Sequence, residues 1–167
     1  MDASTVRLFL GLWPDEPVRE RLRARRDAWT WPRGATPVAT DKLHMTLHFL
    51  GDQPASLLPA LLEGVAVPFA PFSLSVGRAA IWHGGVAVLE PEVVPAALLD
   101  LHGRLSEALV ALGLQPEARA YRPHVTMARR AGRAGVPAVD EPVEWQVDGY
   151  ALVQSLGGRY TVLRAYR

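Results

Sequence analysis

The sequence predicts an α+β fold with a largely antiparallel sheet. Segments with strand and helix character follow in the order β-α-β-α, then β-β-α-β, then a short run of strands. His83-Gly84-Gly85 lies between two apolar runs and indicates a hairpin turn. Helices mixed with hairpins argue against a doubly wound parallel sheet. With 167 residues, 49% apolar and 21% charged, the chain has the size and composition of one globular domain.

The first half of the chain is expected to form two strand–helix units. Residues 5–13 are rich in β-branched and aromatic residues, as in a strand. Residues 14–17 are acidic and proline-rich, which is typical of a helix start, and residues 18–29 have the pattern of an amphipathic helix. After a loop, residues 43–51 are expected to form a strand and residues 55–66 a second helix.

The second half begins with the hairpin, whose strands are residues 72–82 and 86–90. A long helix is expected from about Val93 to Leu112, because Gly113 is a typical C-terminal stop. Residues 122–130 are expected to form the next strand, followed by a loop rich in Gly and Ala. Two further strands are predicted at residues 143–155 and 159–167.

Several classes of protein are disfavoured by composition. The chain has no cysteine, which removes disulfides, thiol nucleophiles and Cys-based metal sites. The short apolar run near the N-terminus lacks the basic start of a signal peptide, and no stretch reaches about 18 uninterrupted apolar residues. We therefore expect a cytoplasmic protein with no membrane segment. The net charge of +1 argues against binding long duplexes by charge alone.

Two segments repeat a His-x-Thr pattern. Leu43-His44-Met45-Thr46-Leu47 matches Pro123-His124-Val125-Thr126-Met127, and each lies in a predicted strand after a helix. Five histidines in this composition would give about 0.2 such matches by chance. Two matches in similar contexts therefore indicate a shared function.

The spacing explains what the pattern can do. Residues i and i+2 of a strand point to the same face, roughly 6.6 Å apart along the chain. Each motif thus presents one imidazole and one hydroxyl together. If the two strands face each other, His44 and His124 can act as general acid and base, and Thr46 and Thr126 can bind the oxygens of one phosphate. This set suits metal-free hydrolysis of a cyclic phosphodiester.

The paired motifs resemble those of the 2H phosphoesterase superfamily. Within it, the chain is similar to the bacterial and archaeal RNA 2′,3′-cyclic phosphodiesterases, also known as 2′-5′ RNA ligase-like proteins. The resemblance covers nearly the whole chain and includes RLFLGLW, LHMTLHFLG, RPHVTMARR and a closing LVQS…GGRYTVL. It implies a single domain over residues 1–167 with two pseudo-symmetric lobes. Two mainly antiparallel sheets with flanking helices would then surround a central cleft.

The resemblance also implies an activity and roles for residues. The reaction would open a 2′,3′-cyclic phosphate at an RNA 3′ end to a 2′-phosphate, with no cofactor and no metal. We assign His124 as the base that activates water and His44 as the acid that protonates the leaving oxygen. The two motifs are chemically symmetric, so the residues themselves leave this order open.

Two more positions follow from the resemblance, each five residues after a histidine. Phe49 would stack on the terminal base, and Arg129 would contact the phosphate. In a regular strand an i+5 residue faces away from residue i, so both need a bend or a bulge to reach the cleft. Arg130 has the regular parity and is the alternative to Arg129 for phosphate binding. Phe49 could instead be a core aromatic residue.

Other residues permit alternative interpretations. On a regular strand His48 shares a face with His44, but two rings roughly 13 Å apart make a poor metal pair, and we expect a packing histidine. His83 is expected in a turn and His102 on a helix surface. Tyr121 and Tyr160 are plausible cleft residues. Arg7, Arg33, Lys42 and Arg122 could bind RNA phosphates, although such residues are more often solvated charges.

Two other functions compete with the hydrolase. The same fold could act on another phosphoester, such as a small cyclic nucleotide or ADP-ribose cyclic phosphate, or catalyse 2′-5′ RNA ligation. A non-catalytic module that binds RNA ends is less favoured, because a binder has no need of two paired imidazoles. The expected partners are RNA 3′ ends with a 2′,3′-cyclic phosphate, without an obligate protein partner, and the expected state is a monomer.

Overall fold

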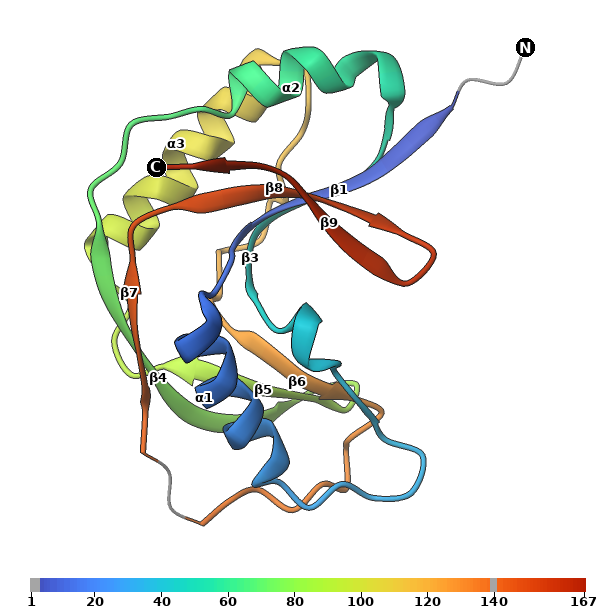
Figure 1. Cartoon of the computed structure of the whole chain (residues 1–167), viewed down its shortest axis with the longest axis vertical. Coiled ribbons are helices and arrows are strands. Elements are labelled where there is room, and N and C mark those ends of the chain that lie inside the picture. Colours follow the sequence, from blue (N-terminus) through green and yellow to red (C-terminus); the bar gives the residue numbers. More distant parts are fainter. Residues whose placement is uncertain (1–3, 139–140) are drawn as a thin grey trace.

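The computed structural model describes residues 4–138 and 141–167, which form an α+β fold. Strands and helices alternate with hairpins, as the sequence predicts (Figure 1). The elements are β1 (Thr5–Leu12), α1 (Glu16–Asp27), β2 (Thr36–Pro37), the 3₁₀ turn η1 (Thr40–Lys42), β3 (Met45–Pro54), the 3₁₀ turn η2 (Ala55–Leu57), α2 (Leu58–Gly64), β4 (Phe72–Trp82), β5 (Val86–Pro91), α3 (Ala96–Ala111), β6 (Val125–Arg129), β7 (Val143–Val147), β8 (Tyr150–Leu156) and β9 (Arg159–Tyr166).

The strands are hydrogen-bonded into one curled antiparallel sheet in the order β7-β4-β5-β6-β3-β1-β8-β9, with β2 beside β6. The β3–β6 ladder contains a single residue pair, Met45 opposite Val125. The two sheets that the family resemblance implies are therefore the two halves of one sheet, joined at this pair. In Figure 1 the β8–β9 end of the sheet lies above and the β4–β5–β6 end below.

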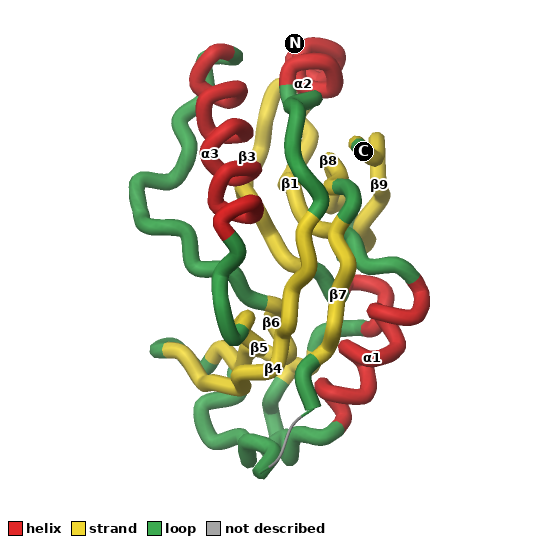
Figure 2. The backbone as a smooth tube through the Cα atoms, turned by 90° about the vertical axis from the view of Figure 1, so that its left-hand side faces the viewer, coloured by secondary structure: helices red, strands yellow, loops and turns green. Residues whose placement is uncertain are grey.

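Helices α1 and α3 cover different parts of the sheet. Helix α3 packs against β3, and α1 packs against β7, as Figure 2 shows from the side. The apolar face of α3 buries four leucines, Leu98, Leu101, Leu105 and Leu109. None of the helices in the described residues is long and apolar enough to cross a membrane.

Helix α1 begins two residues earlier than the sequence predicts. Asp15 is its N-cap, and the Asp15 carboxylate accepts a 3.0 Å hydrogen bond from the backbone N–H of Val18. Pro17 lies in the first turn, where backbone N–H groups have no hydrogen-bond partner within the helix, so its lack of an N–H costs no hydrogen bond. The helix ends at Asp27, also two residues before the predicted end.

The strand predicted over residues 143–155 is wrong, because the chain breaks it at Asp148-Gly149 into two strands. β7 pairs with β4, whereas β8 pairs with β1 at the other end of the sheet. A Cβ on Gly149 would lie 2.6 Å from the backbone oxygen of Tyr166, closer than real Cβ contacts. Glycine therefore allows the close approach at which the chain crosses from one half of the sheet to the other.

Candidate active site

The two His-x-Thr motifs meet where the two halves of the sheet are joined. Met45 and Val125, the middle residues of the two motifs, form the β3–β6 pair. Because the two strands are antiparallel, His44 lies across from Thr126, and Thr46 lies across from His124. All four side chains line one pocket of about 600 Å³. Two segments far apart in the sequence thus present two imidazoles and two hydroxyls to a single space.

Both imidazoles are held in the same way. Nδ1 of His44 lies 2.6 Å from the carbonyl oxygen of Lys42, and Nδ1 of His124 lies 2.8 Å from that of Arg122. A carbonyl oxygen only accepts, so each Nδ1 carries a proton and donates it. Nε2 is then the nitrogen that can exchange a proton with a ligand. Nε2 of His44 is 2.9 Å from the hydroxyl of Thr46.

Aromatic side chains surround the ring of His44. The ring stacks on Phe9 at a centroid distance of 4.7 Å and lies 5.7 Å from Trp13 and 5.6 Å from Tyr160. Desolvation by this burial lowers the pKa of His44 from its usual value to about 4, although the hydrogen bond to the backbone carbonyl opposes the shift. The positive charge of Arg19 lowers the pKa of His44 further. His44 is therefore neutral in the free protein at pH 7.

His124 has a more polar environment. Its ring lies 4.3 Å from that of Trp82, whose indole N–H donates a 2.6 Å hydrogen bond to Glu90. Glu90 also accepts a 2.7 Å hydrogen bond from Arg122. Burial lowers the pKa of His124, and its carbonyl hydrogen bond and the charge of Glu90 oppose this shift.

A bulge in each motif strand explains how the i+5 residues reach the cleft. Leu47 has no partner in β1, and Met127 has none in β5, because the register of each ladder shifts at that residue. Each bulge reverses the parity of the residues that follow it. Phe49 and Arg129 consequently line the same pocket as the histidines. From the residue before each histidine to the i+5 residue, the two segments have the same sequence of buried and exposed positions.

Arg130 is not among the residues that line this pocket. It is exposed and has a φ of 53°, in the left-handed region that non-glycine residues seldom adopt. Arg130 was an alternative to Arg129 because a regular strand would place it on the same face as His124. The bulge at Met127 interrupts this regular alternation, so Arg130 does not reach the pocket.

The same bulge corrects the expectation that His48 shares a face with His44. His48 is 6% exposed and turns toward α3, where its Nε2 lies 2.9 Å from the carbonyl oxygen of His102. The two rings stack at 4.0 Å, and His102 stacks on Tyr121 at 4.1 Å. Within residues 4–138 and 141–167, no group of three or more metal-ligating side chains that could hold a metal ion is found.

Sequence reasoning missed the residues that support His44. Arg19 of α1 is 8% exposed and donates hydrogen bonds to the carbonyl oxygens of Thr40, at 2.8 Å, and Leu43, at 3.0 Å. These bonds hold the segment that leads into the first motif. Tyr121, which the sequence indicates only as a cleft residue, supports the same strand, because its hydroxyl donates a 2.8 Å hydrogen bond to the carbonyl oxygen of Thr46.

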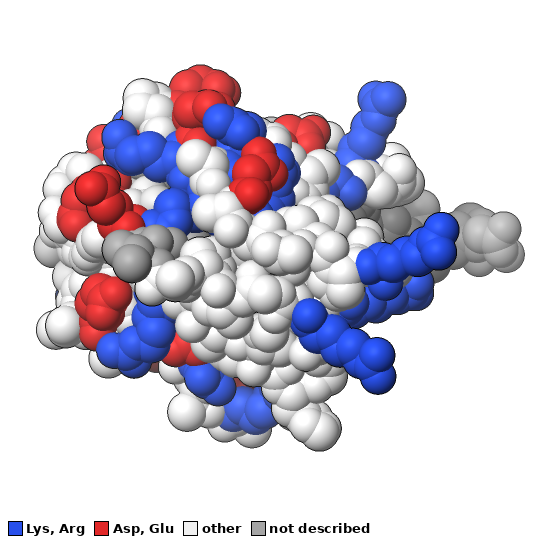
Figure 3. Space-filling view, turned by 90° about the horizontal axis from the view of Figure 1, so that it is seen from below, with Lys and Arg blue, Asp and Glu red and all other residues white. Residues whose placement is uncertain are grey.

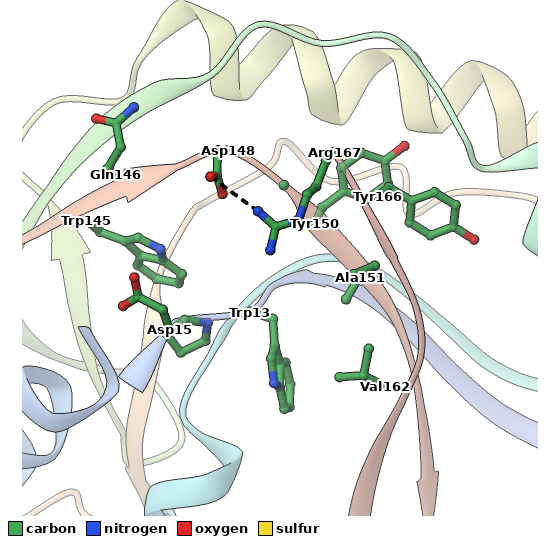
Figure 4. Close-up of a pocket in the computed structure, with 13 residues that line it drawn as sticks. Trp13, Asp15, Trp145, Gln146, Asp148, Tyr150, Ala151, Val162, Tyr166 and Arg167 are labelled. Carbon is green, nitrogen blue, oxygen red and sulfur yellow. Dashed lines mark hydrogen bonds and ion pairs between the residues drawn. The ribbon is translucent and has the colours of Figure 1, made fainter. Parts of the chain in front are cut away.

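A smaller pocket of about 290 Å³ lies beside strands β7, β8 and β9 (Figure 4). Trp13, Trp145 and Tyr150 contribute to its lining, and an ion pair of 3.4 Å between Asp148 and Arg167 lies at its edge. Its described lining includes none of the residues that the sequence singled out for catalysis or phosphate binding.

A curled antiparallel sheet that brings two His-x-Thr strands to one cleft defines the class of the 2H phosphoesterases. Comparison with known proteins agrees, because the family model of the 2′-5′ RNA ligase superfamily matches residues 13–159. This chain belongs to that superfamily.

Individual proteins of known name are also similar to this chain. The RNA 2′,3′-cyclic phosphodiesterase of Thermus thermophilus is 33% identical over 180 positions, which cover 96% of this chain and 89% of that protein. The RNA 2′,3′-cyclic phosphodiesterase of Escherichia coli is 31% identical, with 77% and 74% covered. The crystal structure of apo LigT from E. coli superposes with a TM-score of 0.85 at 28% identity and covers 97% of this chain and 96% of that one.

Proposed function

We propose that this protein hydrolyses the 2′,3′-cyclic phosphate at RNA 3′ ends to a 2′-phosphate, with His44 and His124 as its acid–base pair and without a metal ion. The observation that carries the proposal is the arrangement of two imidazoles and two hydroxyls around the Met45–Val125 pair in one pocket. The names of the relatives support the choice of substrate.

The proposed reaction is one in-line displacement at phosphorus. Nε2 of His124 takes a proton from water as the water oxygen bonds to phosphorus. The bond from phosphorus to the 3′ oxygen breaks, and Nε2–H of His44 gives its proton to that oxygen. The products are a 2′-phosphate and a free 3′ hydroxyl. Thr46, Thr126 and Arg129 would bind the non-bridging oxygens, where negative charge gathers.

The charge states in the cleft fit this scheme once substrate binds. Burial lowers the pKa of both histidines, so the free protein favours neutral rings. A bound phosphate anion stabilises an imidazolium and raises both pKa values. For His44 to act as the acid, bound phosphate must raise its pKa from about 4 by more than it raises the pKa of His124, which stays neutral as the base. We keep the order assigned from the sequence, with His44 as the acid and His124 as the base.

The activity is tested with an oligoribonucleotide that ends in a 2′,3′-cyclic phosphate, by identifying the end group formed. We expect a terminal 2′-phosphate as the product. A 3′-phosphate, or hydrolysis of ADP-ribose cyclic phosphate but not of RNA, would contradict the proposal. A ligated 2′-5′ product as the main outcome would also contradict it.

Removal of metal ions should leave the rate unchanged. The polar side chains that share the pocket with the histidines are hydroxyls, guanidinium groups and an ammonium group, and its described lining holds no carboxylate to bind a divalent cation. We expect the same kcat with the oligonucleotide in excess chelator and in buffer alone. Complete loss of activity that added metal restores would overturn the metal-free mechanism.

We also propose that the protein acts in the cytoplasm as a monomer. Sedimentation of the purified chain tests the oligomeric state, and a stable dimer would contradict it.

A further inference from the structure

The catalytic cleft continues into two pockets that differ in charge. We call the pocket of about 600 Å³ the cationic pocket, because Arg7, Lys42 and Arg129 line it and no carboxylate of the described residues does. We call the adjoining pocket of about 550 Å³ the aromatic pocket, because Trp82, Tyr121 and other rings line it. The two pockets share Thr46, Phe49, His124 and Arg129.

The two positive charges that line only the aromatic pocket are already compensated. Arg119 pairs with Glu117 at 3.4 Å, and Arg122 pairs with Glu90 at 2.7 Å. A further anion gains little from a cation whose charge is neutralised by a neighbour. What this pocket offers is ring surface, on which a nucleobase can stack.

The cationic pocket is different, because its positive charge is largely free. Lys42 makes no ion pair with any described residue; its ammonium lies 5.2 Å from the ring of Tyr160, beside the β8–β9 turn. Arg129 likewise has no ion-pair partner in the part of the chain that the structure describes, whereas Arg7 contacts Asp52 at 3.5 Å. Arg159, the first residue of β9, is exposed next to that turn.

Figure 3 shows that charge is unevenly distributed over the face seen from below. On the right-hand side of this view, Lys and Arg side chains project without acidic neighbours. The acidic side chains gather on the left and at the top of the same view.

We infer that the RNA strand enters the cleft in one direction: the terminal base occupies the aromatic pocket, and the chain leaves through the cationic pocket, where Lys42 and its neighbours bind upstream phosphates. This inference rests on the proposed function and specifies its substrate as a single-stranded RNA longer than one nucleotide. The cyclic phosphate lies in the cationic pocket at its border with the aromatic pocket, because His44 and Thr126 line only the former and His124 lines both. The 5′ side of the terminal nucleotide carries the next phosphate, which is negatively charged and binds in the cationic pocket. The terminal base is uncharged and stacks in the aromatic pocket.

The test compares two substrates with the same terminal base. One is a 2′,3′-cyclic mononucleotide, which has no upstream phosphate, and the other is a hexanucleotide with a 2′,3′-cyclic end. The readout is the ratio of kcat/KM for the hexanucleotide to that for the mononucleotide. Lys42→Gln should lower this ratio about fivefold, as expected for a partly exposed ion pair. It should also reduce the salt slope of log kcat/KM for the hexanucleotide by about 0.7, the contribution of one phosphate contact in a single strand.

Three matched variants control for indirect effects. Lys42→Arg keeps the charge and should keep the ratio. Arg119→Gln removes a charge from the aromatic pocket and should leave the ratio unchanged. Trp82→Leu should lower kcat/KM for both substrates by the same factor, because both carry the terminal base.

The outcomes separate this inference from the proposed function. Wild-type hydrolysis of both substrates with equal kcat/KM and the same salt dependence would overturn the strand path and leave the activity intact. A ratio that falls in Arg119→Gln and not in Lys42→Gln would mean that the strand runs the other way. Absence of hydrolysis of either substrate by the wild type would overturn the proposed function and this inference with it.

Discussion

Replacing either cleft histidine with alanine is expected to lower kcat on a cyclic-phosphate oligonucleotide by about 10²-fold or more, as for the loss of a positioned acid or base. Each ring holds Nδ1–H on a backbone carbonyl and leaves Nε2 for proton transfer. No neighbouring hydroxyl or guanidinium can replace an imidazole near neutral pH. Turnover numbers of purified His44→Ala and His124→Ala, with circular dichroism to verify folding, check this expectation.

Three variants serve as controls. Thr46→Ala and Thr126→Ala should have milder effects, because each removes a hydrogen bond and leaves proton transfer in place. His44→Asn keeps a donor for the carbonyl of Lys42 and controls for a folding defect, because the His44 ring packs among aromatic side chains. Turnover near the wild-type value in any folded histidine variant would contradict the two-histidine mechanism.

Gly149→Ala is expected to lower the free energy of unfolding by about 1–3 kcal/mol, the usual cost of forcing extra atoms into a packed site. The added Cβ would lie 2.6 Å from the backbone oxygen of Tyr166, so strand β9 or the crossing between β7 and β8 must shift. Chemical denaturation of the variant and the wild type measures the difference.

Gly103→Ala is the matched control, because it adds the same methyl group with the opposite expected sign. Gly103 lies inside α3, and a Cβ there meets nothing within 4 Å. Alanine should stabilise this helix by about 0.5–1 kcal/mol. If Gly149→Ala were as stable as the wild type, the crossing would not depend on the close approach that we describe.

The catalytic groups could be predicted from the sequence because their signal is local. His44 and Thr46 are two residues apart, as are His124 and Thr126, and the strand period alone places each pair on one face. The alternation of strands, helices and a hairpin was likewise enough for the α+β class, which the structure confirms.

The features that the sequence did not predict depend on contacts between distant segments. The bulges at Leu47 and Met127 exist only relative to the partner strands, so regular parity placed His48 on the wrong face. The break at Asp148-Gly149 has a local turn signal that the sequence interpretation did not use, whereas the close approach of Tyr166 to Gly149 comes from sheet pairing. Arg19 resembled any other arginine of a solvated helix face until the structure placed its guanidinium on two backbone carbonyls.

The central claim is that two imidazoles act as one acid and one base, and the pH dependence of the rate tests it most directly. One ring must be neutral and the other protonated, so the rate should form a bell between two apparent pKa values that belong to the pair. Burial lowers the pKa of His44 to about 4 and also lowers that of His124, so the optimum of kcat/KM should lie on the acidic side of about 6.5. Bound phosphate raises both values, so the optimum of kcat should lie at higher pH.

The same profile, measured for the single variants, assigns the roles. Loss of the base removes the acidic limb of the bell, and loss of the acid removes the alkaline limb. We expect the residual activity of His124→Ala to be flat on the acidic side and that of His44→Ala to be flat on the alkaline side. A bell in the wild type with one limb lost in each variant is the predicted result. A flat wild-type profile, with the chemical step shown to limit the rate, would contradict the acid–base pair.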